Sequence, residues 1–128
     1  MTASYLLSES KNQILVTGGE LRIKSFSYVG SWALNALKQI KADVAFIGCD
    51  GFHKNGPSIR SYREIEIKQA MIGSAKKSVL LANTQKFSQE GLYCFADFSE
   101  IEMIVTEREL TLEEKKKVPE NMVIYSFI

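Results

Sequence analysis

The chain has 128 residues, of which 45% are hydrophobic and 24% charged, and its formal net charge is +1. This composition is typical of one globular domain with a self-supporting core, and it excludes a disordered chain. The near-neutral charge lacks the basic surface expected of a nucleic-acid-binding domain, and no apolar stretch approaches the roughly 20 residues that span a bilayer.

The two cysteines, Cys49 and Cys94, stand far apart without the CxxC spacing of metal or redox sites. Isolated cysteines are typical of reduced thiols in a cytoplasmic protein, and residues 1–10 lack the pattern of a secretion signal. Cys49 adjoins Asp50, whose charge disfavours the thiolate that a nucleophile needs. Because His53 is the only histidine, we expect no metal site and no cofactor.

Short apolar runs alternate with amphipathic stretches through the first two thirds of the chain. In order, the pattern predicts a strand over 13–17, a helix over 30–40, a strand over 43–48, a helix over 62–77 and a strand over 78–82. Ser31 is the expected cap of the first helix, and Lys76 and Lys77 would favour the dipole of the second from its last turn. Residues 21–29 have no clear period.

The remaining third predicts further strands and one short helix. We expect an edge element over 92–95, a strand over 102–106, a helix over 112–118 with a capping box at its start, and a strand over 122–127. Strands that alternate with helices predict a single α/β domain with a mainly parallel, Rossmann-like sheet flanked by helices. The loops after residues 17, 48 and 82 would then leave one edge of the sheet.

Four segments carry a family resemblance, namely VTGGEL (16–21), DVAFIGCDGF (43–52), YREIEIKQAM (62–71) and LLANTQKF (80–87). In order and spacing they resemble the C-terminal effector-sensing domain of DeoR-family transcriptional regulators, and DFSEIEMIVTEREL (97–110) fits the same pattern. The resemblance implies the ribose-5-phosphate isomerase and CoA transferase-like fold. It also implies a phosphorylated sugar or related metabolite as the ligand.

The resemblance implies a set of ligand-binding residues, which are Gly18, Gly19, Asp50, Gly51, Glu64, Lys68 and Lys86. Glycines let backbone N–H groups approach an anion, a loop aspartate accepts hydrogen bonds from sugar hydroxyls, and a loop lysine pairs with phosphate. Glu64 and Lys68 have a second interpretation, because an i, i+4 pair of this polarity also stabilises a solvated helix face.

The chain departs from the family pattern at two places. Asn83 stands where the family usually has an aspartate, so the charge presented to a ligand differs. The helix-turn-helix domain and the first strands of the sensor do not fit into residues 1–11. We therefore expect residues 1–128 to be a partial effector-sensing domain, as an expressed fragment or a shortened gene product, that reaches DNA only through a domain it lacks.

The sequence favours a sensor that binds its effector without turnover and is not an enzyme, as part of a homo-oligomer with no membrane partner. One alternative is a sugar-phosphate isomerase-like enzyme, since isomerases of this fold transfer protons through carboxylates. Ile47 and Gly51 stand where those isomerases have acids, and Arg60 stands near their lysine. The other alternative is a dimerisation module without ligand, which would need an exposed apolar patch.

Overall fold

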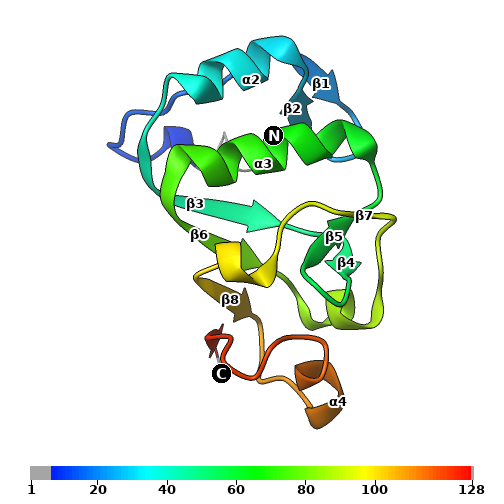
Figure 1. Ribbon diagram of the computed structural model, residues 1–128. Helices are drawn as coiled ribbons and strands as arrows, with labels where there is room; N and C mark the ends of the chain where they lie inside the picture. Colours follow the sequence, from blue (N-terminus) through cyan, green and yellow to red (C-terminus); the bar gives the residue numbers. More distant parts are fainter. Residues whose placement is uncertain (1–6, 128) are drawn as a thin grey trace.

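The structure is a computed structural model that describes residues 7–127, and its centre is a parallel four-stranded sheet (Figure 1). The strands lie in the order β3 (Ala42–Gly48), β6 (Ala75–Leu81), β8 (Met103–Thr106) and β9 (Ile124–Ser126). All three neighbouring pairs are parallel. The predicted α/β fold with a mainly parallel sheet is therefore confirmed.

The strand register divides the sheet into two faces. Ile47 pairs with Leu80, Leu80 with Ile104 and Ile104 with Ile124, so this row points to one side, the inner face. Ile47, Leu80 and Ile104 are at most 1% exposed and lie in the main hydrophobic core. Side chains alternate along a strand, so the intervening residues form the outer face.

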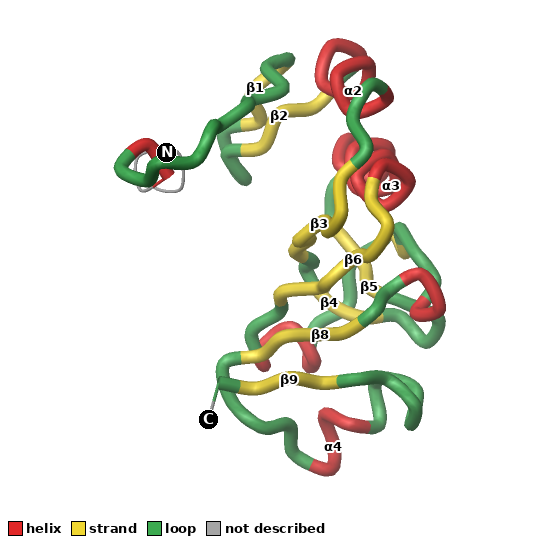
Figure 2. Tube along the Cα trace, turned by 90° about the vertical axis from the view of Figure 1, so that its left-hand side faces the viewer, coloured by secondary structure: helices red, strands yellow, loops and turns green. Residues whose placement is uncertain are grey.

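Two helices stack beside the edge strand β3 (Figures 1 and 2). The helix α3 (Ile65–Ser74), preceded by the 3-10 turn η1 (Tyr62–Glu64), packs on β3 and β6, and α2 (Ser31–Lys38) packs on α3. The expected cap at Ser31 is wrong. Gly30 is the N-cap residue because its φ of 89° suits glycine, and no side chain caps this helix.

A second, antiparallel sheet covers the inner face. Its strands are β4 (Gly51–Phe52), β5 (Pro57–Ile59) and β7 (Tyr93–Cys94), accompanied by the 3-10 turns η2 (Thr84–Ser88) and η3 (Phe98–Glu100). The Phe52 ring lies 4.5 Å from the Phe87 ring and 6.1 Å from the Phe98 ring, between centroids. Of this sheet the sequence predicted only the element near 92–95, because strands of two or three residues carry no readable period.

The predicted strand over 13–17 is wrong. No residue of that segment lies in a strand, and Leu15 is 78% and Val16 58% exposed. An apolar run becomes a strand only when a partner supplies the ladder, and no such partner is found among residues 7–127. Residues 21–29, for which the sequence shows no clear period, instead belong to an antiparallel hairpin of β1 (Glu20–Arg22) and β2 (Ser27–Val29).

The predicted helix over 62–77 ends too late. At Ala75 the backbone turns to φ −118° and ψ 150°, and β6 begins there rather than at residue 78. Lys77 pairs with Val44 across the sheet, and Lys76 forms an ion pair with Asp43 at 3.3 Å. The interpretation of Lys76 and Lys77 as helix-dipole partners is therefore wrong, because the sheet ladder outcompetes helix propensity there.

The C-terminal elements follow the predicted order with shorter bounds. The strands expected over 102–106 and 122–127 are β8 and β9. The expected helix over 112–118 is confirmed only as α4 (Leu112–Lys115), where Thr111 and Glu114 form the predicted capping box.

Candidate functional site

Lys68 of α3 reaches the carboxyl end of β3. Its Nζ donates to the Gly48 carbonyl oxygen at 2.8 Å and lies 5.5 Å from the centroid of the Phe95 ring. Burial lowers the pKa of Lys68, and the negative charges of Glu64 and Asp50 partly oppose that shift. A partly desolvated ammonium therefore sits where β3 ends.

Asp50 follows β3 directly. Its Oδ2 accepts a hydrogen bond from the Arg60 backbone N–H at 2.9 Å, which fastens the loop after β3 to the end of β5. Within the described residues, the second carboxylate oxygen has no hydrogen-bond partner. The guanidinium of Arg60 donates to Gln89 Oε1 at 3.2 Å.

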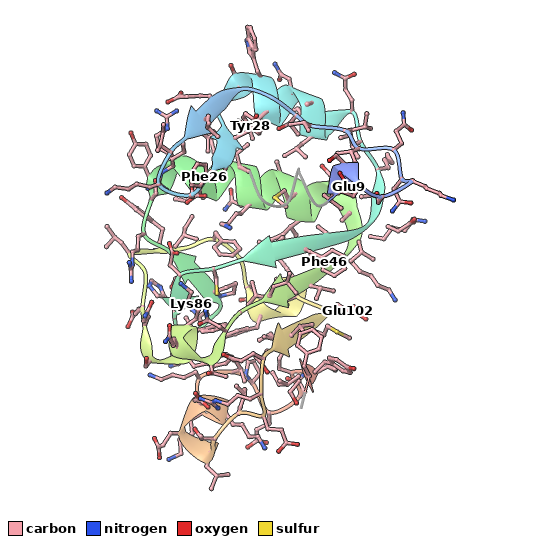
Figure 3. All side chains as sticks on the ribbon, turned by 180° about the vertical axis from the view of Figure 1, so that it is seen from behind. Glu9, Phe26, Tyr28, Phe46, Lys86 and Glu102 are labelled. Carbon is pink, nitrogen blue, oxygen red and sulfur yellow. The ribbon has the colours of Figure 1, made fainter. Side chains whose placement is uncertain are left out.

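Lys86 enters the same region from the adjacent strand. It lies in η2, directly after β6, and Figure 3 labels it beside the small sheet. Burial raises the pKa of Cys49 to about 11, while the positive charges of Lys68 and Lys86 oppose the rise. Lys86 and Lys68 therefore both act on the thiol at the end of β3. Of the three loops predicted to leave one edge of the sheet, those after β3 and β6 do so, because the two strands are parallel neighbours, whereas residues 13–17 form no strand.

Cys49 remains a thiol in this setting. A thiol with a pKa of about 11 is almost fully protonated near neutral pH, so it lacks the thiolate that a nucleophile requires. Both Cys49 and Cys94 are free cysteines, as the sequence predicted.

Glu64 connects this region to the β1–β2 hairpin. It accepts a hydrogen bond from Ser27 Oγ at 2.8 Å and one from Arg22 at 3.5 Å, and its side chain is only 12% exposed. Lys68 meanwhile binds the Gly48 carbonyl oxygen. The two side chains are thus engaged with other elements, and the interpretation as a pair on a solvated helix face does not fit this geometry.

The three predicted glycines have conformational or packing roles. Gly18 and Gly19 have φ of 67° and 109°, and a Cβ on Gly19 would lie 2.9 Å from the Val29 carbonyl oxygen. These two residues follow no strand, and Gly19 lies against β2 and α2. A Cβ on Gly51 would lie 2.3 Å from the Gln89 carbonyl oxygen, so this glycine permits a close backbone approach.

Sequence reasoning missed Glu107, which holds the loop that carries Lys86. Its carboxylate accepts hydrogen bonds from the Thr84 N–H at 2.7 and 3.2 Å and from the Thr84 hydroxyl at 3.3 Å. The available signal was an acidic residue immediately after β8, at the same edge of the sheet as Asp50.

Two searches of the described part of the chain bear on metals and membranes. Residues 7–127 contain no group of three or more histidine, cysteine or acidic side chains placed to hold a metal ion. Within the same residues, no helix combines the length and apolar character needed to cross a membrane.

Comparison with known proteins identifies the family of this domain. Residues 1–108 match the family described as the DeoR C-terminal sensor domain. Because the match covers most of the chain, the protein belongs to this family, and the resemblance predicted from the sequence is confirmed.

Curated relatives are transcriptional regulators. A glycerol-3-phosphate regulon repressor of Haemophilus influenzae is 25% identical over 127 residues, which are 98% of this chain and 46% of the relative. An uncharacterized HTH-type transcriptional regulator of the same organism is 26% identical over 92% of this chain and 46% of the relative. The HTH-type transcriptional repressor GlcR of Bacillus subtilis is 28% identical over 83% of this chain and 41% of the relative. The chain thus spans less than half the length of these relatives.

A cavity of about 550 Å³ lies elsewhere, lined by residues that include Leu110, Val118 and Met122. These residues fall outside the matched range 1–108.

Proposed function

We propose that this chain is the effector-sensing part of a DeoR-type regulator that binds a phosphorylated sugar or related metabolite without turnover. One observation carries the proposal: Asp50 and Lys86 follow two adjacent parallel strands, and Lys68 reaches the carboxyl end of the first of them. In open α/β sheets, ligands bind in the crevice outside the carboxyl ends of the strands. The names of the relatives support this class of effector, since one is a glycerol-3-phosphate regulon repressor.

In the proposed complex each side chain has a chemical task. Lys86 and Lys68 pair with the phosphate through charge-assisted hydrogen bonds, and the Asp50 oxygen without a partner accepts from a sugar hydroxyl. Glu64 passes the occupancy of this site to the β1–β2 hairpin, because it holds Ser27 and Arg22 one helical turn from Lys68. In this proposal, Gly18, Gly19 and Gly51 contribute through the backbone conformations and the close backbone approach that glycine allows.

We expect a sugar phosphate such as glycerol 3-phosphate to stabilise the folded chain. At 100 times its dissociation constant, a ligand that binds only the folded state adds about 2.7 kcal/mol to the free energy of unfolding. Lys86→Ala should weaken binding by on the order of 1.5–3 kcal/mol, because the phosphate loses a charge-assisted hydrogen bond. Isothermal titration calorimetry and thermal unfolding with and without ligand measure both effects.

Lys54→Ala is the matched control, because Lys54 is an exposed loop lysine on the same small sheet. It should leave the affinity for the sugar phosphate unchanged. Equal affinities of the wild-type and Lys86→Ala chains would contradict the assignment of Lys86.

The affinity should fall as the pH rises through the lowered pKa of Lys68. Burial lowers the pKa of Lys68 in the free protein, whereas a bound phosphate dianion favours the ammonium, so binding takes up a proton. The loss begins as the pH passes through the lowered pKa of Lys68. Phosphate itself is already a dianion above pH 7, since its second pKa is about 6. Titrations between pH 7 and 10 test this, and Lys68→Gln should flatten the profile.

The free protein should show the opposite pH dependence. The unfolded chain keeps its proton on Lys68 up to the ordinary lysine pKa, while the folded chain releases it earlier. Unfolding free energy therefore rises with pH between the lowered and the ordinary pKa of Lys68. If Lys68→Gln leaves the pH dependence of the ligand affinity unaltered, Lys68 is not part of the site.

The alternative of an isomerase-like enzyme lacks support from the arrangement of acids. Glu64 is bound to Ser27 and Arg22, and the Asp50 carboxylate accepts a hydrogen bond from the Arg60 backbone N–H, so both acids are engaged in contacts that hold the fold. We expect no aldose–ketose interconversion of pentose or hexose phosphates by the purified chain. A turnover that Asp50→Asn abolishes would identify an enzyme instead, and a coupled assay with each sugar phosphate measures it.

We further propose that the chain acts in the cytoplasm as part of a homo-oligomer and reaches DNA only through a helix-turn-helix domain outside residues 1–128. The formal net charge of +1 supports this division, because duplex binding requires a basic surface.

A further inference from the structure

The 3-10 turn η2, which carries Lys86, is held at two points. Near its end, Phe87 is 2% exposed and its ring lies 4.5 Å from the Phe52 ring, between centroids. At its first residue, Thr84, the backbone N–H and the hydroxyl both donate to the carboxylate of Glu107, which follows β8. Lys86 lies between these two anchors, so the direction in which its side chain leaves the turn depends on both of them.

Glu107 acts on η2 in the way that a capping residue acts on a helix. The N-cap residue of the turn is Asn83, but within the described part of the chain its side chain makes no cap hydrogen bond. The first N–H groups of a helical turn have no partner inside it, and a carboxylate stabilises them. Glu107 supplies this carboxylate from a position 23 residues further along the chain. The contact therefore ties η2 to the end of β8.

The segment that presents Glu107 has supports of its own. Thr106, which ends β8, donates its hydroxyl hydrogen to the Arg108 carbonyl oxygen at 2.6 Å. The Arg108 guanidinium donates to both carboxylate oxygens of Glu114, at 2.8 and 3.0 Å, and so fastens α4. The helix α4 in turn packs against η2. Glu107 is thus held on both sides, as a residue that positions another one must be.

The charge of Glu107 and its hydrogen bonds predict opposite effects on an anionic ligand. As a bare negative charge, Glu107 would repel the ligand, so its removal would strengthen binding. Within residues 7–127, however, the hydrogen bonds of its carboxylate all go to Thr84. If the residue anchors η2, its removal weakens binding, because Lys86 is no longer preorganised for the ligand. The sign of the change therefore separates the two roles.

We propose that Glu107 is a positioning residue for effector binding, which holds Lys86 at the carboxyl end of β6 through its hydrogen bonds to Thr84. The proposed function assigns Lys86 to the phosphate of the effector, and the role of Glu107 rests on that assignment. An acidic residue thereby strengthens the binding of an anion.

Calorimetric titration of the chain with glycerol 3-phosphate, and with inorganic phosphate as the minimal probe, tests the sign. Glu107→Ala should weaken binding by about tenfold, within the range expected for one hydrogen bond. Glu107→Gln keeps one oxygen for the Thr84 N–H and should recover part of the affinity. In the Lys86→Ala chain, Glu107→Ala should have no further effect on affinity, because it acts only through Lys86.

Glu109→Ala is the matched control. It removes the same charge from the same exposed segment, but the Glu109 side chain makes no hydrogen bond or ion pair within residues 7–127. Its affinity for either probe should not fall. A fall equal to that of Glu107→Ala would contradict the proposal, since charge alone would then account for both.

Hydrogen exchange of the ligand-free chain tests the anchor without any ligand. The Lys86 and Gln89 amides, which donate to carbonyl oxygens of the same turn region, should exchange about tenfold faster in Glu107→Ala, while the β6 amides keep their protection. The proposal is overturned if η2 exchange is unchanged, if Glu107→Ala binds as tightly as the wild type, or if its loss persists in the Lys86→Ala chain. If the wild-type chain binds neither probe, the proposed function fails and the binding role of Glu107 with it, whereas exchange still decides whether Glu107 anchors η2.

Discussion

Leu80→Ala is expected to lower the free energy of unfolding by about 2–5 kcal/mol. Leu80 is fully buried in the middle of β6, between Ile47 on β3 and Ile104 on β8, so truncation leaves a cavity where three strands meet. Urea denaturation followed by far-UV circular dichroism measures the loss, with an unchanged m-value as evidence that only stability has changed.

The neighbouring residue supplies the control. Leu81 lies on the same strand but on the outer face, where it is 46% exposed. Leu81→Ala should therefore cost less than about 1 kcal/mol, since little apolar area leaves the core. A larger cost for Leu81→Ala than for Leu80→Ala would mean that β6 is shifted by one residue, which exchanges its inner and outer faces.

Gly56→Ala should destabilise the chain by at least about 3 kcal/mol, beyond the usual range for overpacking. A Cβ on Gly56 would lie 1.8 Å from the Ala96 carbonyl oxygen, a backbone atom that cannot rotate away. The turn between β4 and β5 would have to move away from residues 96–97. The small sheet would then no longer cover the inner face of the central sheet. Chemical denaturation and the near-UV signal of the aromatic cluster report this change.

Gly73 provides the opposite case within the same chain. It lies inside α3, and a Cβ there would meet nothing within 4 Å. Gly73→Ala should stabilise the protein by about 0.5–1 kcal/mol, because alanine has the higher helix propensity. If Gly56→Ala were tolerated as well as Gly73→Ala, residues 56 and 96 could not be in contact.

Apolar runs predicted the central sheet, because each of its strands lies within such a run in the sequence. The runs around Ile47, Leu80 and Ile104 are apolar and end at polar loops, and all three became strands. The same criterion failed at 13–17, where the pattern is equally apolar. Strand formation depends on a partner across the ladder, which is a property of distant residues and has no local signature.

The residues of the candidate site also differ in how well the sequence could place them. Asp50 and Lys86 could be placed near one another from the sequence, since each follows a strand of one parallel sheet. The position of Lys68 could not be predicted so firmly, because it depends on how α3 is rotated against β3. Glu107 acts through hydrogen bonds to Thr84, and such long-range contacts between a loop and a strand end leave no periodic trace.

The contrast between the two thiols has a practical consequence. Cys49 is buried, and its pKa of about 11 leaves only about one molecule in 10⁴ as thiolate at pH 7. Cys94 is exposed on β7, next to Phe95, over whose ring the Lys68 ammonium lies. The wild-type chain therefore carries one exposed thiol and one buried thiol. A maleimide fluorophore would label Cys94 and spare Cys49, with no cysteine to add or remove.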